Sequence, residues 1–313
     1  MTPDRILSNP VRVLTQEQRE AYFENGYLLV EAAIGKDWLG RLRAAVAELT
    51  EQSRTVRDSD NKWNLEPGHG PQSPRLRRVA NPVVHHKAFW EFAAESVLPE
   101  IVADLVGPDV KFIESQLNFK WAQGGAEIRW HQDIQFNPYT NYSQAGFGLF
   151  LEDVGPEQGP MGVIPKSHEG ELYDLYDDRD EWVGFIRETD LTRIDLGRAV
   201  YLTGPAGSIQ IHNCRTVHGS AANRSGRNRP ILINHYCSAD SFPYTSPALP
   251  SEFLGRIVRG RPARWAHVDP RSCRLPPDWV AIGGYKTIFA YQQGEAREQS
   301  ADRGRPQRPL IMV

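Results

Sequence analysis

His131 and Asp133 stand two residues apart in the segment Trp130-His131-Gln132-Asp133. On a β-strand such residues share one face, with Cα atoms roughly 6.5–7 Å apart, so their side chains can converge on one metal ion. A second histidine from a distant strand would complete a set of two histidines and one carboxylate, which is typical of Fe(II) oxygenases. An isolated His-x-Asp pair more often marks a surface turn, so the metal interpretation needs support from elsewhere.

His218, in Thr216-Val217-His218-Gly219-Ser220, supplies that second histidine. Eleven residues later Arg229 stands just before the apolar strand predicted around Ile231–Ile233. A dicarboxylate co-substrate needs a planar guanidinium for its distal carboxylate, and Arg229 is the natural candidate. Arg224 and Arg227 are the alternatives, although both fall in a predicted turn where a solvated charge is the simpler interpretation.

The segment Phe112–Trp121 alternates between apolar and polar residues, which predicts a strand with two different faces. One face would carry Ile113, Leu117, Phe119 and Trp121, and the other Glu114, Gln116, Asn118 and Lys120. If the apolar face packs against outer helices, the polar face lines a wet cavity. A strand whose polar face meets bulk solvent would show the same alternation.

Taken together, these motifs resemble the phytanoyl-CoA dioxygenase family, which includes ectoine hydroxylase. The likeness rests on His131-Gln132-Asp133, His218-Gly219-Ser220, Arg229, the stretch Gly159–His168 and the early Phe23-x-x-x-Tyr27. It extends from about Thr15 to Tyr236 and is weaker in the C-terminal quarter.

The resemblance implies a mainly β fold with flanking helices, namely a double-stranded β-helix (a cupin-like jelly-roll barrel). It implies Fe(II) held by His131, Asp133 and His218, with 2-oxoglutarate as co-substrate. It also implies that Asn118 and Ser220 help Arg229 to hold 2-oxoglutarate, and Lys120 is a further candidate contact on the same face as Asn118. Related halogenases replace the ligand carboxylate with a small residue, so the presence of Asp133 argues against halogenation.

The implied reaction consumes O2 and 2-oxoglutarate, is supported by ascorbate in vitro, and yields succinate and CO2. We expect hydroxylation of an unactivated C–H bond of a small or medium-sized metabolite; desaturation or epoxidation of a natural-product scaffold is the alternative outcome. A non-catalytic jelly-roll binding protein would not need the complete metal set together with Arg229. A zinc or manganese cupin-like hydrolase or isomerase would not need Arg229 either, and would form no succinate.

Helix signals come first along the chain and strand signals follow. Thr15–Gln18 fits a capping box and predicts a helix that ends at Asn25-Gly26. Further expected elements are a strand over Tyr27–Val30, helices around Trp38–Leu49 and Val97–Val106, and strands over Phe112–Trp121, Ile128–Ile134, Gly146–Glu152, Ser208–His212 and Ile231–Tyr236. We therefore predict one oxygenase domain over residues 1–296, with helical additions at about 15–107 and a barrel core at about 110–240, followed by a charged tail over 297–313.

Five further histidines are predicted to be structural, namely His85, His86, His168, His212 and His235. Of these, His212 is expected to be hydrogen-bonded in the core, and His235 is expected to pack there, with a place in the barrel lining as the alternative. Four aromatic residues near the metal motif either shape a substrate pocket or pack in the core: Trp130, Phe136, Tyr139 and Tyr142. The polar segments Gln52–Ser73 and Gln135–Gln144 are candidates for a lid.

The 313-residue chain is 40% hydrophobic and 24% charged with a net charge of −3, so we expect a globular protein with no nucleic-acid partner. The basic run Arg256–Arg264 lacks interleaved aromatic residues and is interpreted as a surface loop. No signal-peptide core and no run of 18 apolar residues occurs, which predicts a cytoplasmic protein without membrane association. The three cysteines lack metal-binding spacing and are expected to be reduced thiols. Oligomeric state is not encoded in any readable pattern.

Overall fold

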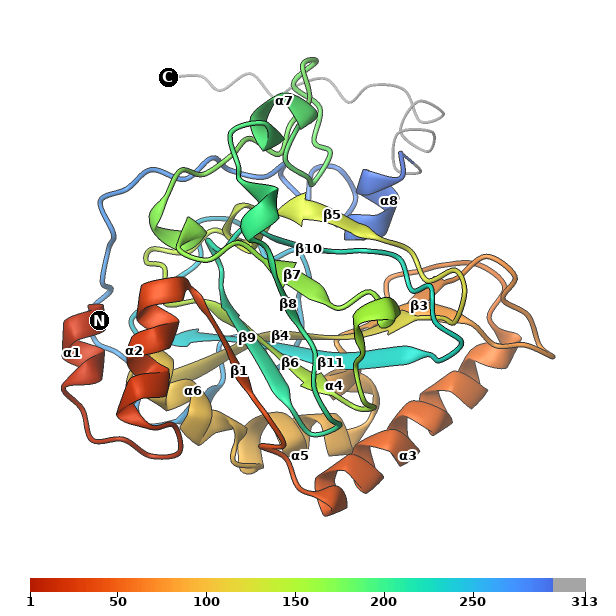
Figure 1. Cartoon of the computed structure of the whole chain (residues 1–313), viewed down its shortest axis with the longest axis horizontal. Helices are drawn as coiled ribbons and strands as arrows, with labels where there is room; N and C mark the ends of the chain where they lie inside the picture. Colours follow the sequence, from red (N-terminus) through yellow and green to blue (C-terminus); the bar gives the residue numbers. More distant parts are fainter. Residues whose placement is uncertain (295–313) are drawn as a thin grey trace.

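Two antiparallel β-sheets form the centre of the structure, a computed structural model that describes residues 1–294 (Figure 1). The tail predicted over 297–313 lies outside the described residues. The larger sheet has the strand order β1-β9-β6-β11-β4-β3-β2, with β12 paired to β4, and the smaller sheet has the order β5-β10-β7-β8. The strands of the larger sheet are β1 (Tyr27–Val30), β2 (Trp63–Leu65), β3 (Leu76–Ala80), β4 (Val110–Lys120), β6 (Ala145–Phe150), β9 (Ile209–Asn213), β11 (Arg229–Ser238) and β12 (Ile257–Arg259). Those of the smaller sheet are β5 (Ile128–His131), β7 (Met161–Val163), β8 (Val200–Leu202) and β10 (His218–Ser220).

Helices cover the outer face of the larger sheet, where α3, α5 and α6 lie along one side of the molecule in Figure 1. Buried apolar side chains of these helices and of the sheet form the main core, which includes Leu42, Phe89, Val102, Leu117 and Tyr236. The helices are α1 (Pro3–Leu7), α2 (Gln16–Asn25), α3 (Lys36–Gln52), α4 (Pro82–His85), α5 (Lys87–Glu95), α6 (Leu98–Val106), α7 (Glu188–Leu191) and α8 (Ile288–Gln292). In the part of the chain that the structure describes, no helix is both long and apolar enough to span a bilayer.

The expected mainly β fold with flanking helices is confirmed, and so are several element boundaries. Helix α2 begins with the predicted capping box, in which Gln18 N–H donates to the Thr15 hydroxyl and the Gln18 side chain accepts from Thr15 N–H. It ends at Gly26, whose φ of 81° is a left-handed conformation that glycine adopts without strain. The three cysteines are free thiols, as expected.

The polar alternation along β4 is confirmed, with one correction at its start. Glu114, and every second residue from there to Lys120, faces the space between the sheets. Ile113, however, is not on the outer apolar face, because a β-bulge opposite the His235/Tyr236 step shifts the pairing register. The bulge places Phe112 in the main core beside Tyr236, whereas Ile113 joins a separate inner cluster.

Candidate metal centre and co-substrate pocket

The smaller sheet brings two histidines to the same rung. His131 is the last residue of β5, His218 is the first of β10, and the two are direct partners in the antiparallel ladder. The strand predicted to reach Ile134 ends at His131, and Asp133 begins a 3-10 turn instead. The chain turns there because Ile134 N–H donates to the Cys214 carbonyl and no longer continues the ladder.

The side chains of His131, Asp133 and His218 nevertheless converge. Oδ1 of Asp133 lies 3.4 Å from Nε2 of His131 and 3.6 Å from Nε2 of His218. Ligand atoms about 2.1 Å from a metal and at right angles to each other would be about 3 Å apart. The three donor atoms therefore need only a small contraction to bind one ion, and two histidines with one carboxylate suit Fe(II).

Backbone carbonyls fix the tautomers of both histidines. Nδ1 of His131 lies 2.8 Å from the Arg129 carbonyl oxygen, and Nδ1 of His218 lies 3.0 Å from that of Thr216. A carbonyl oxygen can only accept, so each Nδ1 must carry a hydrogen, which leaves Nε2 of each ring as the atom that can bind a metal beside Asp133. This arrangement orients the ligand histidines of metal sites.

The electrostatics of the cluster suit a cation. Burial alone would raise the pKa of the Asp133 carboxyl, but His218 and the three other imidazoles around it hold that pKa well below its usual range. Burial, together with the neighbouring His131, holds the pKa of His218 well below its usual range. The carboxylate is therefore charged and His218 is neutral, which are the protonation states that ligate metals.

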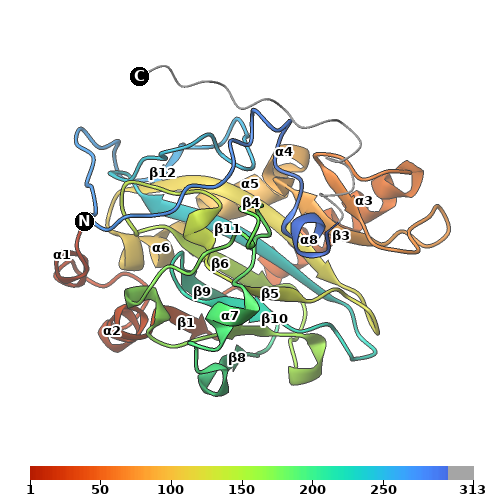
Figure 2. The same cartoon turned by 90° about the horizontal axis from the view of Figure 1, so that it is seen from above.

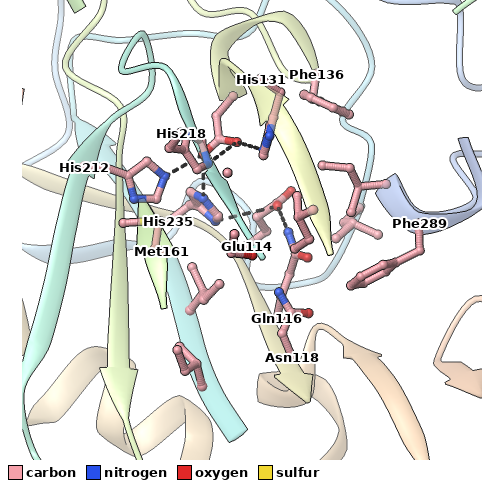
Figure 3. A pocket seen from close by; sticks show the side chains of 18 of the residues that line it. Glu114, Gln116, Asn118, His131, Phe136, Met161, His212, His218, His235 and Phe289 are labelled. Atoms are coloured by element: carbon pink, nitrogen blue, oxygen red, sulfur yellow. Dashed lines mark hydrogen bonds and ion pairs between the residues drawn. The ribbon is translucent and has the colours of Figure 1, made fainter. Parts of the chain in front are cut away.

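The larger sheet forms the opposite wall as a series of cross-strand rungs. The first rung is Glu114, His235, Gly146 and His212, and the second is Gln116, Ile233, Gly148 and Gln210. The next two rungs bring Asn118 beside Ile231 and Lys120 beside Arg229. The metal set thus faces the first rung (Figure 3). Arg229, three rungs further along the pairing of β4 with β11, lies at the far end of the same wall.

Arg229 is a buried cation that has no carboxylate partner among the described residues. Its side chain is 6% exposed, and none of the ion pairs among the described residues involves it. Its Nε has no hydrogen-bond partner, and burial lowers the pKa of the guanidinium to about 10, so it is charged at neutral pH. Arg224 and Arg227, the alternatives, are exposed on the preceding turn and do not line the cavity.

The other predicted co-substrate contacts also line the cavity. Asn118 has a buried side-chain oxygen without a partner. Lys120 is less available, because its ammonium donates to the carbonyl and hydroxyl of Ser220, at 3.1 and 2.8 Å, and to the Ala221 carbonyl. Burial and the neighbouring Arg229 lower the pKa of Lys120 well below its usual range.

The cavity has a volume of about 120 Å³ and is closed in part by the C-terminal region, which sequence reasoning did not connect with the site. Tyr285, Ile288 and Phe289 line it, and Figure 2 shows α8 beside β5. Of the four aromatic residues near the metal motif only Phe136 lines the cavity, at 5.7 Å from the His131 ring. No described residue of the segment Gln52–Ser73 lines it, whereas the segment Gln135–Gln144 contributes three side chains.

The predicted packing role of His235 is wrong. Its imidazole points into the cavity and lies between Asp133 and Glu114 (Figure 3). The sequence spacing could have predicted this orientation. His235 lies an even number of residues after Arg229 on β11, so both side chains point to the same face of the strand. His212 is buried and hydrogen-bonded as predicted, but its partner is Asp133.

The other histidines lie away from this site. His168 contacts the Phe23 carbonyl oxygen through Nε2, at 3.0 Å. His86 accepts from Ala88 N–H at the start of α5, and neither His85 nor His86 belongs to a metal-capable group among the described residues.

Comparisons with known proteins show which proteins this chain resembles. The chain is 28% identical over 262 residues to a probable alpha-ketoglutarate-dependent hypophosphite dioxygenase of Stutzerimonas stutzeri, covering 83% of this chain and 90% of the relative. It is 26% identical over 252 residues to the ectoine dioxygenase of Stutzerimonas stutzeri (strain A1501), covering 74% and 80%. The crystal structure of EctD from S. alaskensis with 2-oxoglutarate and 5-hydroxyectoine has a TM-score of 0.65 at 23% identity, covering 84% of this chain and 90% of that one, which supports the fold. The family model of phytanoyl-CoA dioxygenase (PhyH) matches residues 22–231, and this chain therefore belongs to the phytanoyl-CoA dioxygenase family.

Proposed function

We propose that this protein is an Fe(II)- and 2-oxoglutarate-dependent dioxygenase that hydroxylates a C–H bond of a small polar metabolite. The observation that carries the proposal is the unpaired guanidinium of Arg229 in the same cavity as the metal set of His131, Asp133 and His218. A buried charge without a counter-ion is costly unless a ligand supplies one. A zinc or manganese hydrolase would explain the metal set but not this cation.

Each residue has a separate task in this proposal. His131, Asp133 and His218 hold the iron, which with 2-oxoglutarate and O2 supplies the oxidising chemistry. Arg229 binds the distal carboxylate of 2-oxoglutarate, and Asn118, one rung away in the same cavity lining, offers its side-chain N–H as a donor to the co-substrate. Lys120 holds Ser220 in place, so that the Ser220 hydroxyl keeps a fixed position beside the co-substrate.

Uncommitted polar groups support a small polar substrate. Asn137 is 4% exposed, and neither its side-chain oxygen nor its nitrogen has a partner. The side-chain oxygen of Gln144, which is 3% exposed, also lacks a partner, and both residues line the cavity. Leaving such groups unpaired costs about 1–3 kcal/mol each, so a substrate that hydrogen-bonds to them gains affinity.

The test is succinate formation by metal-stripped protein supplied with Fe(II), 2-oxoglutarate, ascorbate and oxygen. Wild-type protein is expected to form succinate slowly without its prime substrate, and Asp133→Ala to form none, because it lacks one iron ligand. Anaerobic addition of Fe(II) and 2-oxoglutarate is expected to produce a visible charge-transfer band in wild type only. Ectoine, which is named for one relative, is a suitable first substrate for C–H hydroxylation, and hypophosphite, which is named for the other and has no C–H bond, tests whether oxygen is inserted into a P–H bond instead.

The product identifies the reaction. A product heavier by one oxygen atom, formed in step with succinate, is expected for hydroxylation, whereas loss of two hydrogen atoms would indicate desaturation. Absence of both succinate and the charge-transfer band in folded wild-type protein would refute the proposed function. Zinc-dependent turnover without 2-oxoglutarate would favour a hydrolase.

A further inference from the structure

We propose that His212 and His235 are positioning residues that hold Oδ2 of Asp133 and leave Oδ1 as the only oxygen for the metal. Both histidines come from the larger sheet, opposite the strands that carry the ligand histidines. The inference rests on the proposed iron site and adds a function for side chains that neither bind iron nor reach the 2-oxoglutarate end of the cavity.

His212 makes the direct contact. Its Nε2 lies 2.8 Å from Oδ2 of Asp133, and its Nδ1 is buried without a partner. Because a carboxylate oxygen only accepts, the hydrogen of His212 resides on Nε2 and is donated to Asp133. A hydrogen bond to a charged group is among the stronger ones in proteins, worth about 1.5–3 kcal/mol.

His235 supports the same oxygen from another strand. Its Nε2 lies 3.5 Å from Oδ2 of Asp133, and its Nδ1 lies 3.7 Å from Oε1 of Glu114. Glu114 is itself oriented, because the Gln116 amide donates to its Oε1 at 3.0 Å. Nδ1 of His235 has no hydrogen-bond partner, so its contact with Glu114 is an ion-pair contact and not a hydrogen bond. Figure 3 shows Gln116, Glu114 and His235 gathered on one wall below the metal set.

Gly146 makes room for both imidazoles. It lies between His212 and His235 in the sheet and pairs with each of them. A Cβ at this position would lie 2.4 Å from Cε1 of His212 and 3.1 Å from Nε2 of His235. Its φ is outside the left-handed region, so the position requires glycine for space and not for backbone conformation.

Holding one carboxylate oxygen matters for the chemistry. A facial set of three protein ligands leaves three positions on iron, two for 2-oxoglutarate and one for O2. If Asp133 swung round and bound through both oxygens, one of those positions would be lost. The hydrogen bond from His212 occupies Oδ2 and so opposes that binding mode.

The same atoms admit one competing interpretation. The donor atoms of Asp133, His212 and His235 lie within 4.8 Å of one another and form a second metal-capable group. A second ion there would replace the hydrogen bond from His212. The contact of 2.8 Å between His212 and Asp133, and the second carboxylate beside His235, favour hydrogen bonding. The number of metal ions bound per chain distinguishes a hydrogen-bonded His212 from a second metal site.

The experiment compares His212→Leu with His212→Gln, because the glutamine amide can place an N–H near the Nε2 position and leucine cannot. Iron affinity is measured by anaerobic titration, and the Fe(II)–2-oxoglutarate charge-transfer band is recorded. We expect about 10–100-fold weaker iron binding and a shifted band in His212→Leu, which is typical of lost outer-sphere contacts. His212→Gln is expected to restore most of the affinity and the original band position.

A second pair of variants needs no change to either histidine. Gly146→Ala displaces both imidazoles and is expected to reproduce the loss of iron affinity. Gly148→Ala adds the same methyl group to the same face of β6, but against the flexible Gln210 side chain, and is expected to leave iron affinity unchanged. His267→Gln, at an exposed position, serves as the control for removing a histidine far from the site. If His212→Leu does not fold, Gly146→Ala carries the test.

Wild-type iron affinity and band position in both His212→Leu and Gly146→Ala would overturn the inference. Two iron equivalents per wild-type chain, with one lost in His212→Leu, would also overturn it in favour of a second metal site. Failure of the proposed function looks different, because wild-type protein itself would then show no charge-transfer band.

Discussion

Replacing Arg229 with methionine is expected to stabilise the protein without ligands and to abolish its response to 2-oxoglutarate. The side chain is buried and has no ion pair or hydrogen bond among the described residues, so in the absence of 2-oxoglutarate it is an uncompensated charge. Methionine fills a similar space without that charge. The same substitution removes the group proposed to bind the distal carboxylate of 2-oxoglutarate.

The size of the effect follows from the guanidinium pKa. Burial lowers the pKa of Arg229 to about 10. One pKa unit corresponds to about 1.4 kcal/mol, so the buried charge costs the unliganded fold roughly 3 kcal/mol at neutral pH. Because the folded pKa is below the unfolded one, this cost is fully present below pH 10 and vanishes only at higher pH. A gain of about 1–3 kcal/mol should raise the melting temperature by several degrees.

The assay is thermal unfolding of metal-loaded protein with and without 2-oxoglutarate under anaerobic conditions. Ligand at 100 times its dissociation constant stabilises a protein by about 2.7 kcal/mol. Wild type should therefore gain several degrees on addition of 2-oxoglutarate, whereas Arg229→Met should start higher and gain little. Arg224→Met, on the exposed turn, should match wild type in both conditions. An Arg229→Met variant that melts lower without ligand, or still responds fully to 2-oxoglutarate, would refute the reasoning.

Three further predictions concern the rest of the molecule. Asp104 accepts from the three backbone N–H groups of Arg12–Leu14, so Asp104→Ala should lower the free energy of unfolding by about 2–4 kcal/mol in urea titrations; an unchanged midpoint would contradict this. Burial raises the pKa of Cys237 to about 12 and that of Cys273 to about 11. Because the thiolate is the reactive form, iodoacetamide at pH 8 should label no cysteine until guanidinium unfolds the protein, as mass spectrometry can verify. Phe289→Ala opens the cavity wall and should raise the KM for the prime substrate, while succinate formation without that substrate stays near wild type.

Residue type was the strongest signal in the sequence. Arg229 was favoured because a dicarboxylate needs a guanidinium partner, and it lies in the cavity wall, whereas Arg224 and Arg227 do not. Alternation along β4 correctly placed Glu114 and every second residue up to Lys120 on one polar face, because residues two apart on a strand share a face, but it left open whether that face lines a cavity or meets solvent. Both arguments use information that is local in the chain.

Features that depend on a partner segment could not be predicted in this way. The bulge that turns Ile113 inward depends on how β4 pairs with β11, and no property of the local sequence encodes it. The C-terminal cover of the cavity has little regular structure. It is held by distant contacts, such as the donation from Trp279 Nε1 to the Phe136 carbonyl and from the Gln292 amide to the Gly184 carbonyl.

The three metal ligands differ in how firmly the fold holds them. His131 and His218 are direct partners in one ladder, and backbone carbonyls fix both rings. Asp133 lies on a turn beyond the strand, where no ladder restrains it, and its carboxylate offers two equivalent oxygens. A carboxylate with this freedom needs an external partner to present one oxygen only. The larger sheet supplies that partner through His212, so the metal centre depends on both sheets although all its ligands belong to one side.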